Sequence, residues 1–313
     1  MAVTPAQKRA AVDLATIAYT DQVNTASRVA DIEAALAKIP TAAGGPWTLV
    51  WGPGEMEGIL AYVALAADKT RYALAFRGSL GEIMAHEFID TWMLDGETFR
   101  QVPWIYPQGN EVKVSSGMNQ ALGYAMMLTD HATHKHVLDF LREVTAANGG
   151  SLQLLVTGHS LGGALAQLAS QWLYHQLVDV DKNEEIYITP LTFAAPSMGN
   201  QQFATLFETT FPTNWALVNT LDVVPWTWWN LDRIQHMYPP PGQLVAQFGV
   251  AYAGLLALYK DSLAAAYKPI TQPPADTFEG WMPEHPDKFA HTMTENHAIS
   301  IYKDRVVAET GIA

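Results

Sequence analysis

Cysteine is absent from the 313-residue sequence, which excludes disulfide bonds, thiolate metal sites and a cysteine nucleophile. Charged residues are scarce, at 16%, and basic residues are outnumbered by acidic ones, 18 to 31, giving a net charge of −13. A protein without a basic surface gains little from releasing the counterions of nucleic acid. We therefore expect no nucleic-acid partner.

Long hydrophobic runs are lacking as well. The longest uncharged apolar stretch, residues 248–259, is too short to cross a bilayer, which takes about 20 apolar residues. Residues 1–20 indicate an amphipathic helix rather than a signal peptide. The compartment stays open, with a secreted protein whose signal has been removed slightly favoured over a cytoplasmic one. The sequence does not indicate an oligomeric state.

Apolar runs typical of buried strands alternate with segments of helical periodicity over more than half of the chain. The predicted strands are 47–51, 60–67, 72–76, 152–156, 187–195 and 215–219. The predicted helices are two within 5–38, then 117–129, 134–147, 161–178 and 200–210. This alternation predicts an α/β domain with a mostly parallel central sheet flanked by helices.

No flexible linker or repeat divides the sequence, so we predict a single domain over residues 1–313. Residues 239–289 depart from the alternation. They open with three prolines and a glycine, carry an apolar segment of helical pattern and close with a proline-rich stretch. We interpret them as an insertion or cap.

The most informative motif is Gly-His-Ser-Leu-Gly at residues 158–162, between a predicted strand and a predicted helix. In this context Gly-x-Ser-x-Gly is typical of a nucleophile placed on a sharp turn. The flanking glycines lack a Cβ and let the strand and the helix approach closely. Ser160 would then be presented at the end of the sheet, with the backbone N–H of Leu161 directed at a developing oxyanion.

A serine hydroxyl needs a base, and the base needs an orienting acid. When a serine on such a turn comes first in the chain, the acid and then the base follow it. Asp222 comes directly after the predicted strand 215–219, although it would also serve as a helix cap. His297 stands late in the chain, at the start of a predicted terminal helix (297–308). On chain order alone, His291 remains an alternative base.

The sequence resembles the class 3 (fungal-type) lipases of the α/β-hydrolase superfamily. Four blocks carry the resemblance, in this order: AFRGS at 75–79, GHSLGG at 158–163, TFAAPSMGN at 192–200 and NTLDVVP at 219–225. His297 with Tyr302 is a fifth, weaker match. The resemblance implies an α/β-hydrolase fold with residues 80–91 as a lid.

The resemblance also implies a role for each matching residue. Ser160 would be the nucleophile, Asp222 the orienting acid and His297 the general base. Ser79 and Leu161 would supply the oxyanion hole through their backbone N–H groups. No cofactor and no metal would be required.

The expected activity is hydrolysis of carboxylic esters by a lipase or esterase, acting on acylglycerols or other fatty-acyl esters, with the lipid substrate at an oil–water interface. Phospholipase A1 and feruloyl-type esterase activities are alternatives within the enzyme class. A catalytically silent lipid-binding protein is the alternative outside it. Trp226 and Trp228 are candidates to line the acyl pocket, although core packing explains them equally well. Met84, within the predicted lid, is a further candidate for substrate binding.

A second histidine-rich segment offers a competing hypothesis. His131, His134 and His136 are closely spaced and would permit a metal-dependent hydrolase. They fall in a predicted loop between helices, without a carboxylate at helical reach. A solvated polar surface therefore explains them better than a metal site.

Overall fold

The computed structural model of the chain describes residues 2–20, 25–79, 100–106, 111–179, 185–238, 261, 263–264, 266–270, 276–282 and 289–313. The predicted lid at 80–91, Met84 within it, and most of the predicted insertion at 239–289 lie outside the described residues.

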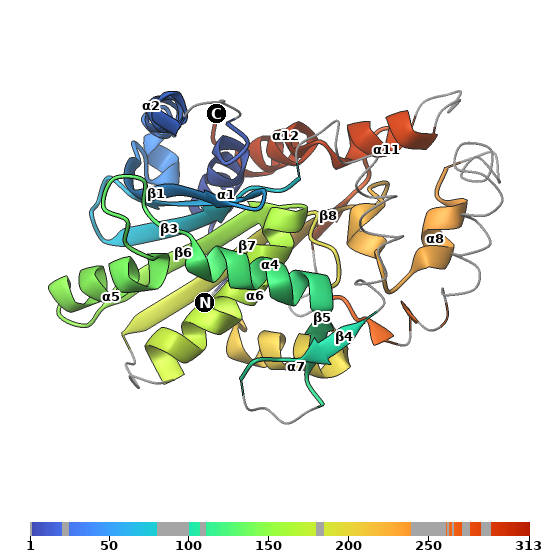
Figure 1. Cartoon of the computed structure of the whole chain (residues 1–313). Helices are drawn as coiled ribbons and strands as arrows, with labels where there is room; N and C mark the ends of the chain where they lie inside the picture. Colours follow the sequence, from blue (N-terminus) through green and yellow to red (C-terminus); the bar gives the residue numbers. More distant parts are fainter. Residues whose placement is uncertain are drawn as a thin grey trace.

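A seven-stranded sheet forms the centre of the molecule, in the order β1-β2-β3-β6-β7-β8-β9 (Figure 1). The strands are β1 (Thr48–Met56), β2 (Ile59–Leu65), β3 (Arg71–Phe76), β6 (Leu152–His159), β7 (Ile186–Phe193), β8 (Trp215–Asn219) and β9 (Asp276–Phe278). The pairs β1/β2 and β2/β3 are antiparallel, and every pair from β3 to β9 is parallel. The predicted mostly parallel α/β sheet is thus confirmed. A separate antiparallel pair joins β4 (Gln101–Pro103) and β5 (Lys113–Ser115).

Helices cover both faces of this sheet, as Figure 1 shows. One face carries α1 (Pro5–Ile17), α2 (Thr25–Leu36) and α12 (Ile299–Thr310). The other face carries α4 (Ser116–Met127), α5 (Val137–Ala147), α6 (Leu161–Leu173) and α7 (Gln201–Thr210). Side chains alternate along each strand. Tyr62 and Ala64 therefore pack on the face covered by α1, α2 and α12, whereas Ala61 and Val63 pack on the opposite face.

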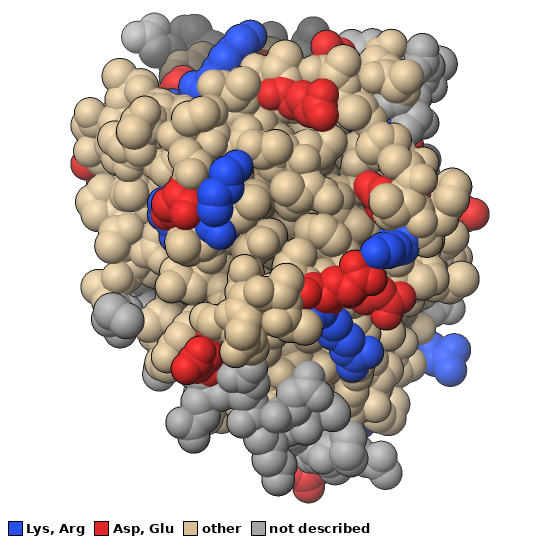
Figure 2. Space-filling model, turned by 90° about the vertical axis from the view of Figure 1, so that its left-hand side faces the viewer, with Lys and Arg blue, Asp and Glu red and all other residues tan. Residues whose placement is uncertain are grey.

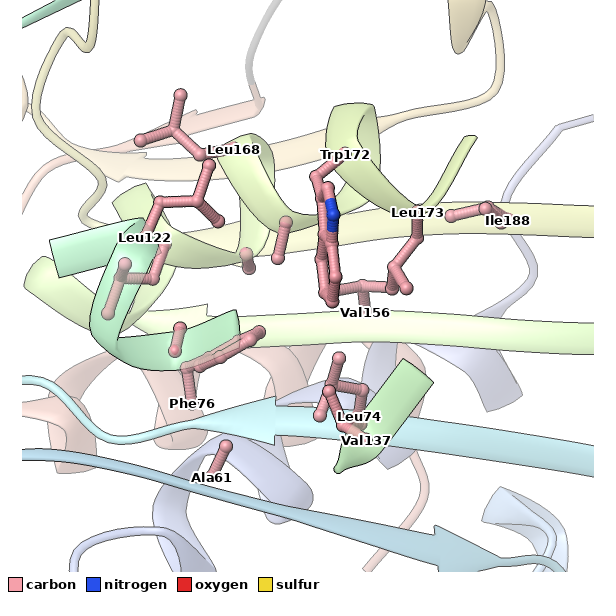
Figure 3. Close-up of a cluster of buried hydrophobic side chains, with 14 of the residues drawn as sticks. Ala61, Leu74, Phe76, Leu122, Val137, Val156, Leu168, Trp172, Leu173 and Ile188 are labelled. Atoms are coloured by element: carbon pink, nitrogen blue, oxygen red, sulfur yellow. The ribbon is translucent and has the colours of Figure 1, made fainter. Parts of the chain in front are cut away.

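Helix α6 is the most deeply buried helix near the sheet, and every residue from Gly162 to Leu173 is buried. Figure 3 shows Leu168, Trp172 and Leu173 of this helix packed over strand residues such as Val156. A helix that is buried all round has no solvent-facing side, so packing on the sheet fixes its position. This packing fixes the position of the helix N-terminus, where Leu161 stands. After Leu173 the chain continues as a π-helical segment, Tyr174–Asp179.

Two elements differ from the sequence-based expectations. The predicted terminal helix at 297–308 was wrong at its start, because His297 is the last residue of α11 (Phe289–His297). Ala298 is extended, with φ −58° and ψ 131°, and α12 begins only at Ile299. Strand β9 was not predicted at all. It is a three-residue edge strand of sequence Asp-Thr-Phe within the range interpreted as an insertion or cap, so this short piece belongs to the sheet.

The remaining described elements are short: α8 (Leu231–His236) and the 3₁₀ turns Thr41–Ala43 and Val224–Trp226. None of the described helices is long and apolar enough to cross a membrane. Figure 2 looks onto the side of the molecule where the parallel strands begin. Basic side chains are few there, and most lie beside acidic ones, so this face offers no broad basic surface.

Candidate active site

Ser160 occupies a strained turn between β6 and α6. Its backbone has φ 60° and ψ −129°, a positive φ that is rare outside glycine. The predicted strand–turn–helix is confirmed, and the glycines are there for the steric reason expected. A Cβ on Gly158 would lie 2.2 Å from the carbonyl oxygen of Gly162, and a Cβ on Gly162 would lie 2.4 Å from that of Phe76. Strand, helix and neighbouring β3 therefore come as close as backbone atoms allow.

Asp222 and His297 form a buried pair, with Asp222 on the loop after β8 and His297 at the end of α11. Nδ1 of His297 lies 2.7 Å from Oδ2 of Asp222, and both side chains are almost completely inaccessible to solvent. Oδ1 of Asp222 accepts the backbone N–H of Val224 at 2.9 Å. Oδ2 also accepts the Tyr302 hydroxyl at 2.6 Å. The carboxylate is thus held at both oxygens, and it fixes the imidazole orientation.

The bond to Asp222 leaves Nε2 as the free ring nitrogen of His297. This atom is buried and has no hydrogen-bond partner among the described residues, Ser160 included. The His297 ring lies 4.5 Å from the ring of His159, the residue directly before Ser160. An unsatisfied buried nitrogen is unusual, and here it marks a position where a proton acceptor is available beside the serine turn.

The turn after β3 packs directly against the serine turn. A Cβ on Gly78 would lie 3.1 Å from the Cβ of Ser160 and 2.5 Å from the carbonyl oxygen of His159. Ser79 follows Gly78, and Leu161 is the first residue of α6. The two residues predicted to form an oxyanion hole are thus chain neighbours of this contact: Leu161 directly follows Ser160, and Ser79 directly follows Gly78.

His159 and Tyr19 form a buried pair that the sequence did not predict. Tyr19 Oη lies 2.7 Å from Nδ1 of His159, across 140 residues of sequence. Burial lowers the pKa of His159 well below its ordinary value, and a charge on the nearby His297 lowers it further. Burial likewise raises the pKa of the Tyr19 hydroxyl. His159 is therefore neutral at pH 7, and it serves as a packed, hydrogen-bonded neighbour of Ser160.

The tryptophans proposed for substrate binding lie in a third apolar cluster next to Asp222. Trp228 is buried there with Val223, Leu231 and Ile234. The Trp226 ring is 5.4 Å from the Trp229 ring and 3.9 Å from the guanidinium carbon of Arg233. A role for Trp226 and Trp228 in an acyl pocket stays a prediction.

Of the histidines at 131, 134 and 136, the first and the last contact backbone carbonyl oxygens through their rings. Nδ1 of His131 lies 2.7 Å from the Gly52 carbonyl oxygen, and Nδ1 of His136 lies 3.3 Å from that of Leu128. Across the described part of the chain, no three His, Asp or Glu side chains are grouped as metal ligands would be. A cavity of about 810 Å³ lies at the opposite ends of the strands, beside Arg71 and Ile186, so it is remote from Ser160.

Comparison with known proteins identifies relatives for the central part of the chain. The family described as Lipase (class 3) matches residues 73–229. A phospholipase A1 of Arabidopsis thaliana, Phospholipase A1-Igamma2, is 26% identical over 204 residues, which are 57% of this chain and 36% of the plant protein. A lipase of Caenorhabditis elegans is 37% identical over 70 residues, 22% of this chain and 19% of the worm protein. The chain thus spans about a third or less of these curated relatives.

Solved structures extend the similarity to the whole fold. M37 lipase superimposes with a TM-score of 0.80 at 21% identity, covering 99% of this chain and 98% of the other. A Penicillium cyclopium protein, MDLA, gives a TM-score of 0.52 at 21% identity, covering 71% and 73% of the two chains. At this level of identity the structural similarity establishes the α/β-hydrolase-type fold.

Proposed function

The chain belongs to the class 3 lipase family, and from this premise we propose that it hydrolyses carboxylic esters of fatty acids with a serine nucleophile. The observation that carries the proposal is the buried Asp222–His297 pair beside the strained Ser160 turn. A hydrogen-bonded acid and base next to a serine on a strand-to-helix turn are the parts that acyl transfer requires.

The first half of the reaction follows from the tautomer of His297. Its Nδ1–H donates to Asp222, so Nε2 carries the lone pair. Nε2 takes the proton of the Ser160 hydroxyl as Oγ attacks the ester carbonyl carbon. Asp222 stabilises the imidazolium that results. The Oγ–Nε2 contact forms when substrate binds, since catalytic hydrogen bonds are often long or absent in the free enzyme.

The N-terminus of α6 contributes to both halves of the reaction. The backbone N–H groups of Ser79 and Leu161 hold the tetrahedral oxyanion, and each such donor contributes about 3–4 kcal/mol. The dipole of α6, whose positive end lies at its N-terminus, further stabilises the oxyanion. His297 then gives its proton to the leaving alcohol, which departs as the acyl-enzyme forms. Water, deprotonated by His297, releases the fatty acid and restores Ser160. No step requires a cofactor.

The substrate class is a lipid ester presented at an oil–water interface, with acylglycerols as the first candidates. A second candidate is hydrolysis of an acyl ester in a phospholipid, because a relative found over 57% of this chain is a phospholipase A1. The two differ in the part of the alcohol beyond the oxygen that His297 protonates, and the steps above do not involve that part.

Replacement of Ser160 tests the proposal. Ser160→Ala should abolish hydrolysis of a p-nitrophenyl ester and labelling by a fluorophosphonate, with an unchanged circular dichroism spectrum. Ser151→Ala, at a serine at the opposite end of β6 whose hydroxyl bonds the Glu185 carbonyl, is the matched control and should retain both. Full turnover by Ser160→Ala would refute the assignment. Emulsified triacylglycerol compared with phosphatidylcholine vesicles then separates lipase from phospholipase activity.

A further inference from the structure

We propose that Asn219 and Asn296 form a positioning pair that holds the base, His297, in register with the acid, Asp222. The inference rests on the proposed function and adds two residues to it. Asn219 is the last residue of β8, three residues before Asp222, and Asn296 directly precedes His297. Both asparagines are almost fully buried.

Asn296 uses the full hydrogen-bonding capacity of its amide. Its Nδ2 donates to the carbonyl oxygens of Trp281, at 2.8 Å, and Thr292, at 3.0 Å. Its Oδ1 accepts the backbone N–H of Trp281 at 3.0 Å and Nδ2 of Asn219 at 3.0 Å. Both N–H groups and both lone pairs of the single oxygen are used at once, and a side-chain amide supplies this combination.

Asn219 connects this amide to the acid. Its Nδ2 also donates to the backbone carbonyl of Asn296 at 2.9 Å, and its Oδ1 accepts the N–H of Leu221 at 3.0 Å. The second bond shapes the turn that carries Asp222. The backbone N–H of Asn219 donates to the Tyr302 oxygen at 3.2 Å, and that hydroxyl in turn donates to Asp222. The pair is therefore linked to the acid by two routes.

The space around the two amides is closed by Gly280. A Cβ at this position would lie 2.1 Å from Oδ1 of Asn296 and 2.3 Å from Nδ2 of Asn219, closer than any side chain tolerates. Gly280 thus lets the turn that carries Trp281 reach the network. Three segments distant in sequence, at 219–222, 280–281 and 296–297, meet at one amide pair.

The asparagine pair fixes the spacing of the two backbone segments, which the Asp222–His297 hydrogen bond alone does not. Asp222 and His297 stand 75 residues apart, and a single hydrogen bond joins their side chains. A fully satisfied buried network is rigid, because each bond it loses leaves an unpaired buried group. The Asn219–Asn296 contacts fix the distance between the two backbones, so the imidazole does not have to be positioned by the carboxylate alone.

The test replaces each asparagine with its isosteric acid, which removes the donor and places an oxygen against a carbonyl. Asn296→Asp and Asn219→Asp are compared with Asn214→Asp, a buried asparagine at the other end of β8 whose amide donates to the Phe211 carbonyl at 2.6 Å. Active sites are counted by fluorophosphonate labelling, so kcat is expressed per labelled Ser160. The substrate is a soluble p-nitrophenyl ester, measured across pH.

We expect kcat per labelled site to fall about 10- to 100-fold in Asn296→Asp and Asn219→Asp, with KM within about twofold, because misplacing a catalytic group by about 1 Å has effects of this size. The acid limb of the pH–kcat profile should also move, because the imidazole would change its contact with Asp222 and a new carboxylate would stand near it. Asn214→Asp should lower only the melting temperature.

Unchanged kcat and pH profile per labelled site in both variants would overturn the inference while leaving the proposed function intact. Failure of both variants to fold would overturn it as well, because the pair would then be a structural requirement without a separate effect on positioning. If the unsubstituted protein hydrolyses no ester, or hydrolyses it no faster than Ser160→Ala, the proposed function itself is wrong.

Discussion

The Tyr302 hydroxyl donates a 2.6 Å hydrogen bond to Oδ2 of Asp222, the same oxygen that faces His297. Burial and the negative charge of Asp222 raise the pKa of this hydroxyl well above its usual value. A raised pKa keeps the phenol protonated, so the bond persists through the neutral range and is lost only at strongly alkaline pH. Tyr302 thus shares the carboxylate with the proposed base and moderates its charge.

Tyr302→Phe should therefore lower stability and shift the pH profile in a defined direction. A hydrogen bond to a charged group contributes about 1.5–3 kcal/mol, and chemical denaturation should show a loss of this size. The freed carboxylate would attract the imidazolium more strongly, so the acid limb of kcat should move to higher pH. Because the bond to His297 remains, kcat should fall less than about tenfold. A shift of the acid limb to lower pH would contradict this account.

Asp222→Asn should inactivate the protein while preserving its fold. The carboxylate accepts from three donors: the Val224 N–H, the Tyr302 hydroxyl and the His297 ring. An amide has one acceptor oxygen, so at least one donor would face Nδ2. The His297 tautomer with the proton on Nδ1 would then no longer be fixed. A comparable change in a serine triad lowers kcat about 10⁴-fold.

Asp130→Asn is the matched control for that substitution. Asp130 is also buried, and its oxygens accept the backbone N–H groups of Gly52 and Thr133. It lies on a loop outside the proposed site, so its loss should reduce the melting temperature without changing kcat per fluorophosphonate-labelled site. Equal losses of kcat in both variants would indicate a general structural effect.

Two glycines allow a test of the serine turn itself. A Cβ on Gly162 would lie 2.4 Å from the Phe76 carbonyl oxygen, so Gly162→Ala must move α6 away from β3 and should destabilise by about 3 kcal/mol. Gly123 lies inside α4 with nothing near its missing Cβ. Gly123→Ala should stabilise by about 0.5–1 kcal/mol, as expected for a helix interior. Urea unfolding measures both, and a neutral Gly162→Ala would show that the turn is not tightly packed.

Features that depend on residues close together in the chain could be predicted from the sequence. Apolar runs locate β3 and β6, and the glycines around Ser160 identify the turn, because these features depend on residues that are neighbours in the chain. Asp222 is also accessible to such reasoning, since a carboxylate after a strand end is a local signal.

The contacts that complete the site come from distant segments and leave no local signal. Tyr19 reaches His159 across 140 residues, and Asn219 reaches Asn296 across 77. His297 was predicted at a helix start but ends α11, because Ala298 adopts an extended backbone that neither helical periodicity nor a proline announces. Which polar side chains meet is decided by the packing of helices on the sheet, and that packing is a property of the whole fold.

A partly buried ion cluster next to the turn of Ser79 gives a further prediction. Glu55 accepts from Nη2 of Arg77 at 2.7 Å and from Arg28 through its other oxygen. Both guanidinium groups are buried, whereas about a third of the Glu55 side chain is exposed, at 36%. Partial burial alone would raise the pKa of Glu55, but the hydrogen bonds from Arg77 and Arg28 outweigh it and lower the pKa below its ordinary value.

The sign of the pH dependence follows from that shift. A carboxyl whose pKa is lower in the folded state stabilises the fold above its unfolded pKa, and this contribution disappears as pH falls through the folded pKa. Glu55→Gln should therefore destabilise by about 1–2 kcal/mol at pH 7, less than a fully buried pair because water screens the exposed part. The difference from the unsubstituted protein should shrink below about pH 4.5.

Asp68→Asn provides the comparison, since Asp68 pairs with Arg71 at 2.7 Å on the surface, where an ion pair contributes at most about 1 kcal/mol. Urea unfolding of the three proteins at pH 7 and at pH 4 measures both effects. Arg77 directly precedes Gly78 and Ser79, so Glu55→Gln should also lower kcat by loosening the turn that carries the proposed oxyanion donor. A Glu55→Gln protein as stable as the parent at pH 7 would show that the two guanidinium groups do not depend on this carboxylate.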